Sequence, residues 1–174
     1  MKHYSIAIDG PSGAGKSTLA RMLAREFGLL YVDTGAIYRT VALAALRRGL
    51  DPADAAGVVA MLPELDIRLA YGDDGLQHMY LAGEDVSGAI RRNEVSAGAS
   101  KVSAIPAVRE FLLEMQRALA RTHSVVMDGR DIGTVVLPDA DLKIYLTADA
   151  ADRARRRCLE LKERGQAVDY EQVL

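Results

Sequence analysis

Short apolar runs and amphipathic helical stretches alternate along most of this chain. The run at 4–8 ends at an Asp-Gly pair and has the length of a buried parallel strand. A glycine-rich segment follows, and from Gly15 the apolar residues recur with helical spacing. The start of the chain therefore predicts a strand, a glycine loop and a helix in direct succession. We expect the inward face of this helix to consist of Leu19, Met22, Leu23 and Phe27.

The same alternation continues through the rest of the chain. Helices are predicted at 36–48, within 51–63, and from Pro106, whose ring suits a first helical turn. A last helix carries Ala151 and Cys158 on its apolar stripe. Strands that alternate with helices favour a three-layer, mostly parallel α/β fold. The further predicted strands are 29–32, 124–127 and 142–146.

One stretch departs from this pattern. Residues 65–70 and 76–81 alternate between apolar and polar side chains, and the segment 72–75 between them is Gly-Asp-Asp-Gly. This arrangement is typical of an antiparallel β-hairpin. Since a hairpin is foreign to a parallel layout, we interpret it as an insertion. The predicted division is a core of residues 1–62 and 103–174 and an inserted region of residues 63–102.

Composition narrows the classes of function. A chain of 174 residues that is 49% hydrophobic has the size and the apolar material of about one domain. The formal net charge of −2 gives no reason to expect a nucleic acid or a membrane as partner. A single cysteine, Cys158, excludes an intramolecular disulfide, and no apolar run is long enough to span a membrane. We expect a cytoplasmic monomer that acts on small molecules.

The strongest chemical signal is the glycine loop. Residues 10–17 match the phosphate-binding pattern G-x-x-x-x-G-K-[ST] and lie between a predicted strand and helix, as a P-loop requires. Glycines allow a tight turn whose N–H groups cradle an anion, and the helix start adds a positive dipole end. Lys16 is expected to reach the outer phosphates and Ser17 to bind Mg²⁺. The predicted ATP-binding residues are Gly10, Pro11, Ser12, Gly13, Ala14, Gly15, Lys16, Ser17 and Thr18.

Two further polar clusters follow predicted strands. Thr34, Tyr38 and Arg39 stand where the strand at 29–32 passes into a helix. Arg39 suits an acceptor phosphate because guanidinium binds phosphate bidentately, whereas Thr34 is equally suited to cap the helix. Asp128 ends another strand and, beside a P-loop, is expected to order Mg²⁺ through water, with a turn aspartate as the alternative.

The chain resembles the bacterial cytidylate kinases over essentially its whole length. The resemblance implies a P-loop fold of the nucleoside-monophosphate-kinase type, with the region 63–102 as the acceptor-binding part. It also implies transfer of the ATP γ-phosphoryl group to CMP or dCMP with Mg²⁺. The segments that carry it are GPSGAGKST at 10–18, DTGAIYR at 33–39, EDVSGAIRRNEVSAGASKVSAIPAVRE at 84–110 and DGRDIGTVVLPDADLKIYL at 128–146.

The resemblance also implies roles for single residues. Thr34 and Tyr38 would lie beside the acceptor nucleotide, while Ser100, Arg109 and Asp131 would read cytosine. The chemistry agrees, because a carboxylate accepts from the N4 amino group and would face an acceptor in uracil. From the residues alone, the favoured interpretations are a surface serine for Ser100 and a solvated helix arginine for Arg109. Catalysis is assigned to Lys16, Arg39, Arg130 and Asp128, and the two arginines would bind the acceptor phosphate.

Two departures from the family pattern affect these assignments. The family commonly has glycine after the P-loop lysine, whereas this chain has Ser17 and then Thr18, so either hydroxyl is a candidate for Mg²⁺. The family also continues beyond Leu174 into an arginine- and aspartate-rich lid, a final strand and a helix. Either the natural chain is longer, which we favour, or this is a fragment. If the chain ends at Leu174, we expect it to be poorly stable and weakly active. The arginines of 153–157 usually indicate a solvated helix face, and the alternative is that they reach a phosphate, since in this fold they precede the lid.

Other functions remain open at this point. P-loops also serve GTPases and ATPases, although the GTPase base-reading pattern N-K-x-D is absent from this sequence. Another small P-loop kinase, of the adenylate or shikimate type, is the first alternative. A non-catalytic nucleotide-binding fragment is the second.

Overall fold

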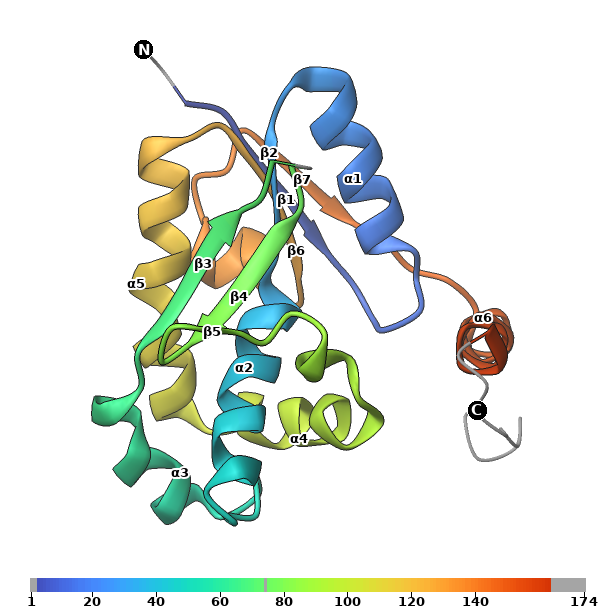
Figure 1. Cartoon of the computed structure of the whole chain (residues 1–174). Helices are drawn as coiled ribbons and strands as arrows, with labels where there is room; N and C mark the ends of the chain where they lie inside the picture. The colour runs from blue at the N-terminus through green and yellow to red at the C-terminus, as the bar shows by residue number, and fades with distance from the viewer. Residues whose placement is uncertain (1–2, 74, 164–174) are drawn as a thin grey trace. The chain divides into compact units, whose positions relative to one another are not determined.

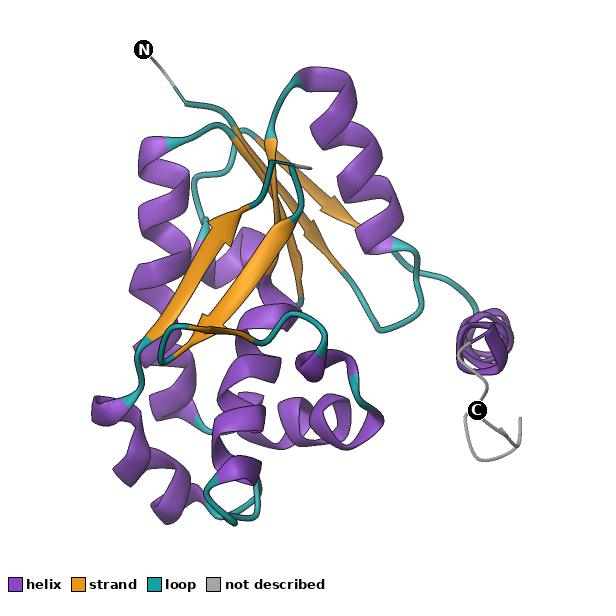
Figure 2. Ribbon diagram, viewed as in Figure 1, coloured by secondary structure: helices purple, strands orange, loops and turns teal. Residues whose placement is uncertain are grey.

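The structure is a computed structural model that describes residues 3–73 and 75–163 (Figures 1 and 2). The chain forms two compact units, one of Met1–Leu30 and Ser124–Leu174 and the other of Tyr31–His123. The predicted insertion, residues 63–102, falls inside the second unit. Its boundaries with a phosphate-binding core stay a prediction.

Parallel strands form the centre of the first unit. Strand β1 (Ser5–Asp9) pairs in parallel with β6 (Val125–Gly129) and with β7 (Leu142–Tyr145). The residues at the middle of β1 and β6 are fully buried, as their continuous apolar runs predict. Helices α1 (Lys16–Phe27) and α6 (Ala150–Glu163) belong to this unit, and a single π-helical turn, η3 (Ile132–Val136), follows β6.

Helix α1 packs through small residues rather than through its large ones. Its predicted inward face is wrong in part, because Met22 and Phe27 are 55% and 64% exposed. The buried residues are Ala20 and Ala24, which let the helix backbone lie close to its neighbours at normal packing density. The helix ends at Gly28, whose left-handed backbone (φ 64°) is the expected stop.

Strand β2 (Leu30–Asp33) leads from one unit into the other. The second unit then holds helices α2 (Thr34–Arg47), α3 (Ala55–Met61), α4 (Asn93–Ser103) and α5 (Pro106–Thr122), with Pro106 in the first turn of α5 as predicted. Two short 3-10 turns, η1 (Leu62–Glu64) and η2 (Ala89–Arg91), connect them. Residues from all four helices and from the hairpin strands described next form the buried core of this unit.

The antiparallel hairpin is confirmed. Strands β3 (Ile67–Tyr71), β4 (Gln77–Leu81) and β5 (Glu84–Asp85) form a separate sheet in that order. The register places Ile67 opposite Leu81 and Tyr71 opposite Gln77. One residue of the predicted turn, Asp74, lies outside the described residues. The predicted class, an α/β fold with a parallel sheet and a small antiparallel one, is therefore correct. Among the described residues, no helix combines the length and apolar character needed to cross a membrane.

Candidate functional site

The phosphate loop lies between β1 and α1, as the sequence predicts. Gly10, Gly13 and Gly15 have φ angles of 145°, 74° and 97°, which residues with a side chain rarely adopt. A Cβ on Gly10 would stand 1.9 Å from the carbonyl oxygen of Leu146, so no side chain fits there. Helix α1 begins at Lys16, directly after the loop, and its first N–H groups lack helical partners. The loop thus has the shape and the dipole of an anion cradle.

Three polar side chains complete this cradle. Lys16 bends back over the loop, and its Nζ donates to the Pro11 carbonyl oxygen at 2.9 Å. The Ser17 hydroxyl donates to Oδ2 of Asp128 at 2.8 Å, and Asp128 is only 5% exposed. Thr18, the other hydroxyl considered for Mg²⁺, is exposed. The structure therefore joins Ser17 to the carboxylate at the end of β6.

Arginines of α6 also reach the loop. Arg153 donates to the carbonyl oxygen of Ser12 at 3.4 Å, and Arg156 donates to those of Gly13 and Ala14 at 3.4 and 3.3 Å. These two side chains therefore reach the phosphate loop, as the alternative interpretation of 153–157 expects, although Arg156 is also exposed. The side chain of Arg157 lies outside the described residues. The guanidinium groups of Arg153 and Arg156 add positive charge next to a loop that is shaped for phosphate.

The predicted acceptor residues of this unit follow β6 directly. Arg130 is exposed, and its Nη1 donates to the carbonyl oxygen of Gly10 at 3.3 Å. Asp131 is half-buried and immediately precedes the turn η3. The carboxylate of Asp9 accepts from the N–H groups of Ile132 at 2.7 Å and Gly133 at 2.8 Å. The segment that carries both acceptor residues is therefore attached to the residue before the phosphate loop.

Asp9 is a site-building residue that the sequence analysis missed. It is 8% exposed, so both of its hydrogen bonds form away from water. Its partners stand 123 and 124 positions later, too far along the chain for any local pattern to predict. The one available signal was a carboxylate that ends a buried strand next to a P-loop.

In the second unit, the start of α2 places Thr34, Tyr38 and Arg39. The helix is capped by Asp33, whose Oδ1 accepts from the N–H of Ala36 at 3.0 Å. The alternative in which Thr34 caps the helix is wrong, because α2 already begins at Thr34, which is 3% exposed. Tyr38 packs against the core of this unit.

Arg39 is held by the same aspartate that caps the helix. Its Nη2 lies 2.8 Å from Oδ2 of Asp33, and the two side chains are 23% and 24% exposed. Its Nε is buried and has no partner among the described residues. The guanidinium group is therefore fixed in place by one carboxylate while part of its donor capacity is unused.

Ser100 lies in the last turn of α4 and Arg109 in the first turn of α5. Nη1 of Arg109 donates to the carbonyl oxygen of Ser103 at 3.4 Å, and the hydroxyl of Ser103 donates to the carbonyl oxygen of Ser100 at 3.0 Å. Arg109 is half-buried rather than fully solvated, whereas Ser100 is exposed on α4. Ser103 thus bonds to the side chain of Arg109 and to the main chain of Ser100.

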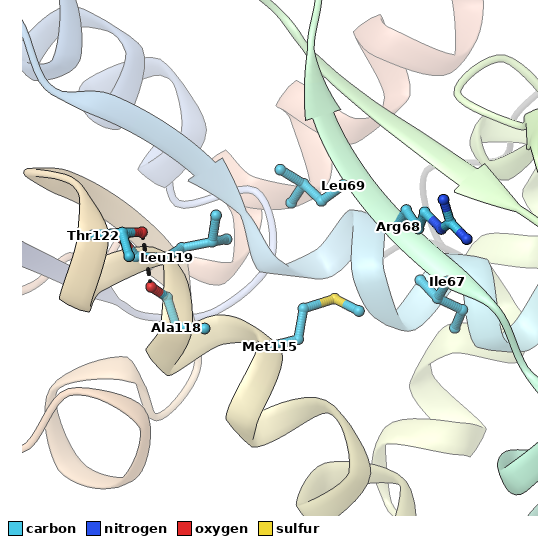
Figure 3. A pocket seen from close by; sticks show the side chains of 7 residues that line it. All are labelled: Ile67, Arg68, Leu69, Met115, Ala118, Leu119 and Thr122. Atoms are coloured by element: carbon cyan, nitrogen blue, oxygen red, sulfur yellow. Dashed lines mark hydrogen bonds between the residues drawn. The ribbon is translucent and has the colours of Figure 1, made fainter.

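A groove of about 440 Å³ also lies on the second unit, between β3 and α5 (Figure 3). Its polar groups already have partners, since the Thr122 hydroxyl donates to the Ala118 carbonyl and Arg68 pairs with Asp66. None of the residues that line it is a predicted site residue, and its surface is mostly apolar. This groove therefore offers no chemistry for phosphoryl transfer. Its lining residues are Ile67, Arg68, Leu69, Met115, Ala118, Leu119 and Thr122.

Comparison with known proteins places this site in a family. The family model described as cytidylate kinase matches residues 6–174. A cytidylate kinase from Pelotomaculum thermopropionicum is 54% identical over 170 residues, which cover 98% of this chain and 75% of that protein. One from Caldicellulosiruptor bescii is 53% identical over 174 residues, covering 100% of this chain and 76% of that protein. One from Pseudomonas paraeruginosa is 49% identical over 170 residues, covering 97% and 74%. With a family model over nearly all of its residues and relatives at about half identity, the chain belongs to the cytidylate kinase family.

Proposed function

We propose that this chain transfers the γ-phosphoryl group of ATP to CMP or dCMP, which yields ADP and CDP or dCDP. The observation that carries the proposal is the phosphate cradle in which Lys16 arches over the loop and Ser17 bonds to Asp128. Membership of the cytidylate kinase family supports the choice of acceptor. Adenylate or shikimate as acceptor, and a binding role without turnover, are less favoured by that membership.

The loop supplies the donor side of the reaction. Its backbone N–H groups and the Lys16 ammonium group would hold the outer phosphates of ATP, where negative charge grows during transfer. Ser17 and Asp128 fit Mg²⁺, because a hydroxyl and a carboxylate joined at 2.8 Å are the hard oxygen donors that this ion prefers. In this role Ser17 binds the ion directly and Asp128 acts through water. Mg²⁺, when bound, neutralises charge on the phosphates and orients them.

The acceptor needs positioning rather than activation. The phosphate of CMP is already anionic at neutral pH, so direct in-line attack requires neither a general base nor a covalent enzyme intermediate. Arg39 and Arg130 are proposed to bind this phosphate, with Thr34 and Tyr38 beside the nucleotide. Support comes from the unused donor capacity of Arg39 and from the placement of Arg130 one hydrogen bond from the phosphate loop.

Selection of cytosine is assigned to Ser100, Arg109 and Asp131. Asp131 would accept from the N4 amino group, and the other two would donate to the ring acceptors. The bond from Arg109 to the carbonyl oxygen of Ser103, one helical turn after Ser100, supports a joint role for these two. The region 63–102 is proposed as the acceptor-binding part. A monomer in the cytoplasm, without nucleic acid or membrane partners, stays a prediction.

The test is ADP release with ATP and Mg²⁺ and, separately, CMP, dCMP, UMP, AMP and shikimate. We expect turnover with CMP or dCMP well above the other three acceptors. Asp131→Asn is the matched variant, because it exchanges one acceptor oxygen for a donor and should narrow the difference between CMP and UMP. Turnover that is highest with AMP or shikimate would contradict the proposal. If no acceptor is used, calorimetric binding of ADP without CMP would favour the non-catalytic alternative.

A further inference from the structure

Two side chains at the turn end of the β3–β4 hairpin form hydrogen bonds to β2, the strand that precedes α2 and Arg39. They are Tyr71, the last residue of β3, and Gln77, the first residue of β4, which stand opposite each other in the antiparallel register. We call this pair the hairpin clamp. We propose that the hairpin clamp positions Arg39 for the acceptor phosphate by fixing Asp33. This inference rests on the proposed function.

Gln77 binds Asp33 through both of that residue's backbone polar groups. The N–H of Asp33 donates to Oε1 of Gln77 at 2.8 Å, and Nε2 of Gln77 donates to the carbonyl oxygen of Asp33 at 3.2 Å. A side-chain amide here does what a neighbouring strand would do for one residue. Since the two bonds act on both sides of the same Cα, they restrict both backbone torsions of Asp33.

Tyr71 holds the same strand two residues earlier. Its hydroxyl donates to the carbonyl oxygen of Tyr31 at 2.8 Å. Burial raises the pKa of Tyr71, so the hydroxyl stays protonated and remains a donor throughout the neutral range. The hairpin clamp therefore contacts β2 at Tyr31 and at Asp33, and the path of the strand between them is fixed from the hairpin.

The carboxylate of Asp33 carries this constraint to Arg39. One oxygen caps α2 at Ala36, and the other lies 2.8 Å from Nη2 of Arg39. Gly35 lies tight against both groups, because a Cβ there would be 3.1 Å from Oδ1 of Asp33 and 3.2 Å from Nη1 of Arg39. A shift of Asp33 therefore moves the guanidinium group with it, and small displacements of a phosphate-binding group are costly in a phosphoryl-transfer site.

The hairpin clamp is not needed to hold the hairpin itself. Met79 and Leu81 of β4 are 1% and 8% exposed and belong to the apolar core of the second unit. The ladder with β3 and the bond from the Met79 N–H to Ser87 add further support. Loss of the Gln77 amide should therefore leave the hairpin folded and change mainly the position of Asp33. A positioning role is thus separable from a structural one.

The experiment is a double-mutant cycle on CMP affinity, measured by calorimetry with the whole chain. Gln77→Leu keeps the size of the side chain and removes both bonds to Asp33. We expect it to raise the dissociation constant for CMP about tenfold, while that for ADP changes less than twofold. In an Arg39→Ala background the same substitution should change CMP affinity less than twofold, because the group through which it acts is gone. Tyr71→Phe should show the same pattern with a smaller change, and it serves if Gln77→Leu does not fold.

Leu81→Val is the matched control, since it lies on the same strand, contributes to the core and makes no bond to 31–33. This substitution should lower thermal stability. Any change that it causes in CMP or ADP affinity should be the same in the wild-type and the Arg39→Ala background. Unchanged CMP affinity in Gln77→Leu, or an equal loss with and without Arg39, would overturn the positioning role and leave the proposed function intact. A wild-type chain that binds ADP but no CMP would overturn the proposed function itself, and the hairpin clamp with it.

Discussion

The two units hold their functional side chains in different ways. In the first unit the predicted site residues bond to one another or to the phosphate loop, as Ser17 does to Asp128 and Arg130 does to Gly10. In the second unit Arg39 is held within its own segment, DTGAIYR, and that segment is held in turn by a residue outside it. Asp33 fixes Arg39 there, and Gln77 fixes Asp33 in turn.

Two aspartates at strand ends make the contrast specific. Asp9 ends β1, is 8% exposed, and uses both carboxylate oxygens on backbone N–H groups. Asp33 ends β2, is about a quarter exposed, and uses one oxygen on a backbone N–H and the other on the side chain of Arg39. Asp9 therefore fixes the course of the main chain, whereas Asp33 fixes one movable charged group.

The difference predicts where substitutions act. In the first unit a change at the loop should alter turnover directly, because the loop residues are proposed to bind the phosphates of ATP themselves. In the second unit a change can act at a distance of one or two contacts, so affinity for the acceptor should respond to residues outside the motif.

The largest effect is expected for Lys16→Ala. Removal of the ammonium group takes away charge stabilisation where negative charge develops, so kcat should fall about 100- to 1000-fold. Thermal stability should change little, because the bond from Nζ to the Pro11 carbonyl oxygen lies within the loop itself. ADP release with saturating ATP and CMP measures the rate. Activity above a tenth of wild type would show that Lys16 is not part of the catalytic machinery.

Lys143→Ala is the matched control for that variant. Lys143 also donates to the carbonyl oxygen of a proline five residues earlier, Pro138, in the same unit. It is exposed and lies outside the phosphate loop. We expect its turnover to remain within twofold of wild type, so a comparable loss in both variants would point to a general effect of removing a lysine.

The next effect separates the two aspartates by stability. Asp9→Asn turns one buried acceptor into a donor that faces an N–H group, which leaves a buried donor unpaired. The free energy of unfolding should fall by about 1–3 kcal/mol, as measured by urea titration. Asp33→Asn keeps a good helix cap and loses mainly a partly exposed ion pair, so its loss should stay below about 1 kcal/mol. Equal losses in the two variants would contradict the distinction between them.

Although Asp33→Asn should change stability little, it should change the affinity for CMP. The amide no longer attracts the guanidinium group as a carboxylate does, so CMP affinity should weaken several-fold while ADP affinity holds. Calorimetric titration with each nucleotide measures both. A weaker affinity for ADP alone would place Asp33 on the donor side and remove it from the acceptor site.

Local sequence patterns were sufficient for the phosphate loop and for the fold class. The glycines, Lys16 and Ser17 are contiguous, and a strand and a helix flank them, so one window of sequence contains nearly all of the cradle. The hairpin was equally local, since its alternating strands and Gly-Asp turn stand side by side. The exposed Met22 and Phe27 were not predictable, because helical periodicity marks an apolar face without saying which residues tertiary packing selects.

Sequence patterns could not supply the residues that support the site. Asp9 bonds to Ile132 and Gly133 across more than 120 positions, and Gln77 bonds to Asp33 across 44. A polar residue at a strand end usually satisfies a turn, so neither one signals a distant partner. The choice of Asp33 over Thr34 as the cap shows the same limit, since both are good caps and only the folded contact with Arg39 separates them.

The smallest predicted effect is on stability at acid pH, and it comes from Asp85 in the second unit. Hydrogen bonds from Ser87, with a contribution from His78, lower the pKa of Asp85 from its usual 3.8 to about 2. The folded state therefore binds fewer protons than the unfolded chain between pH 4 and pH 2. The resulting stability is fully present above pH 4 and is lost as the pH falls through 2. Asp85 is exposed, so the contribution is small in absolute terms.

Asp85→Asn should make that window visible. The variant should be less stable than wild type at pH 6, and urea titrations at lower pH should show the difference shrinking between pH 4 and pH 2. Asp139→Asn, an exposed carboxylate of the first unit, is the control for the loss of one charge. A stability difference between wild type and Asp85→Asn that stayed constant down to pH 2 would contradict this prediction. It would mean that the bonds of Asp85 to Ser87 and His78 stabilise the fold equally with an ionised and with a protonated carboxyl group.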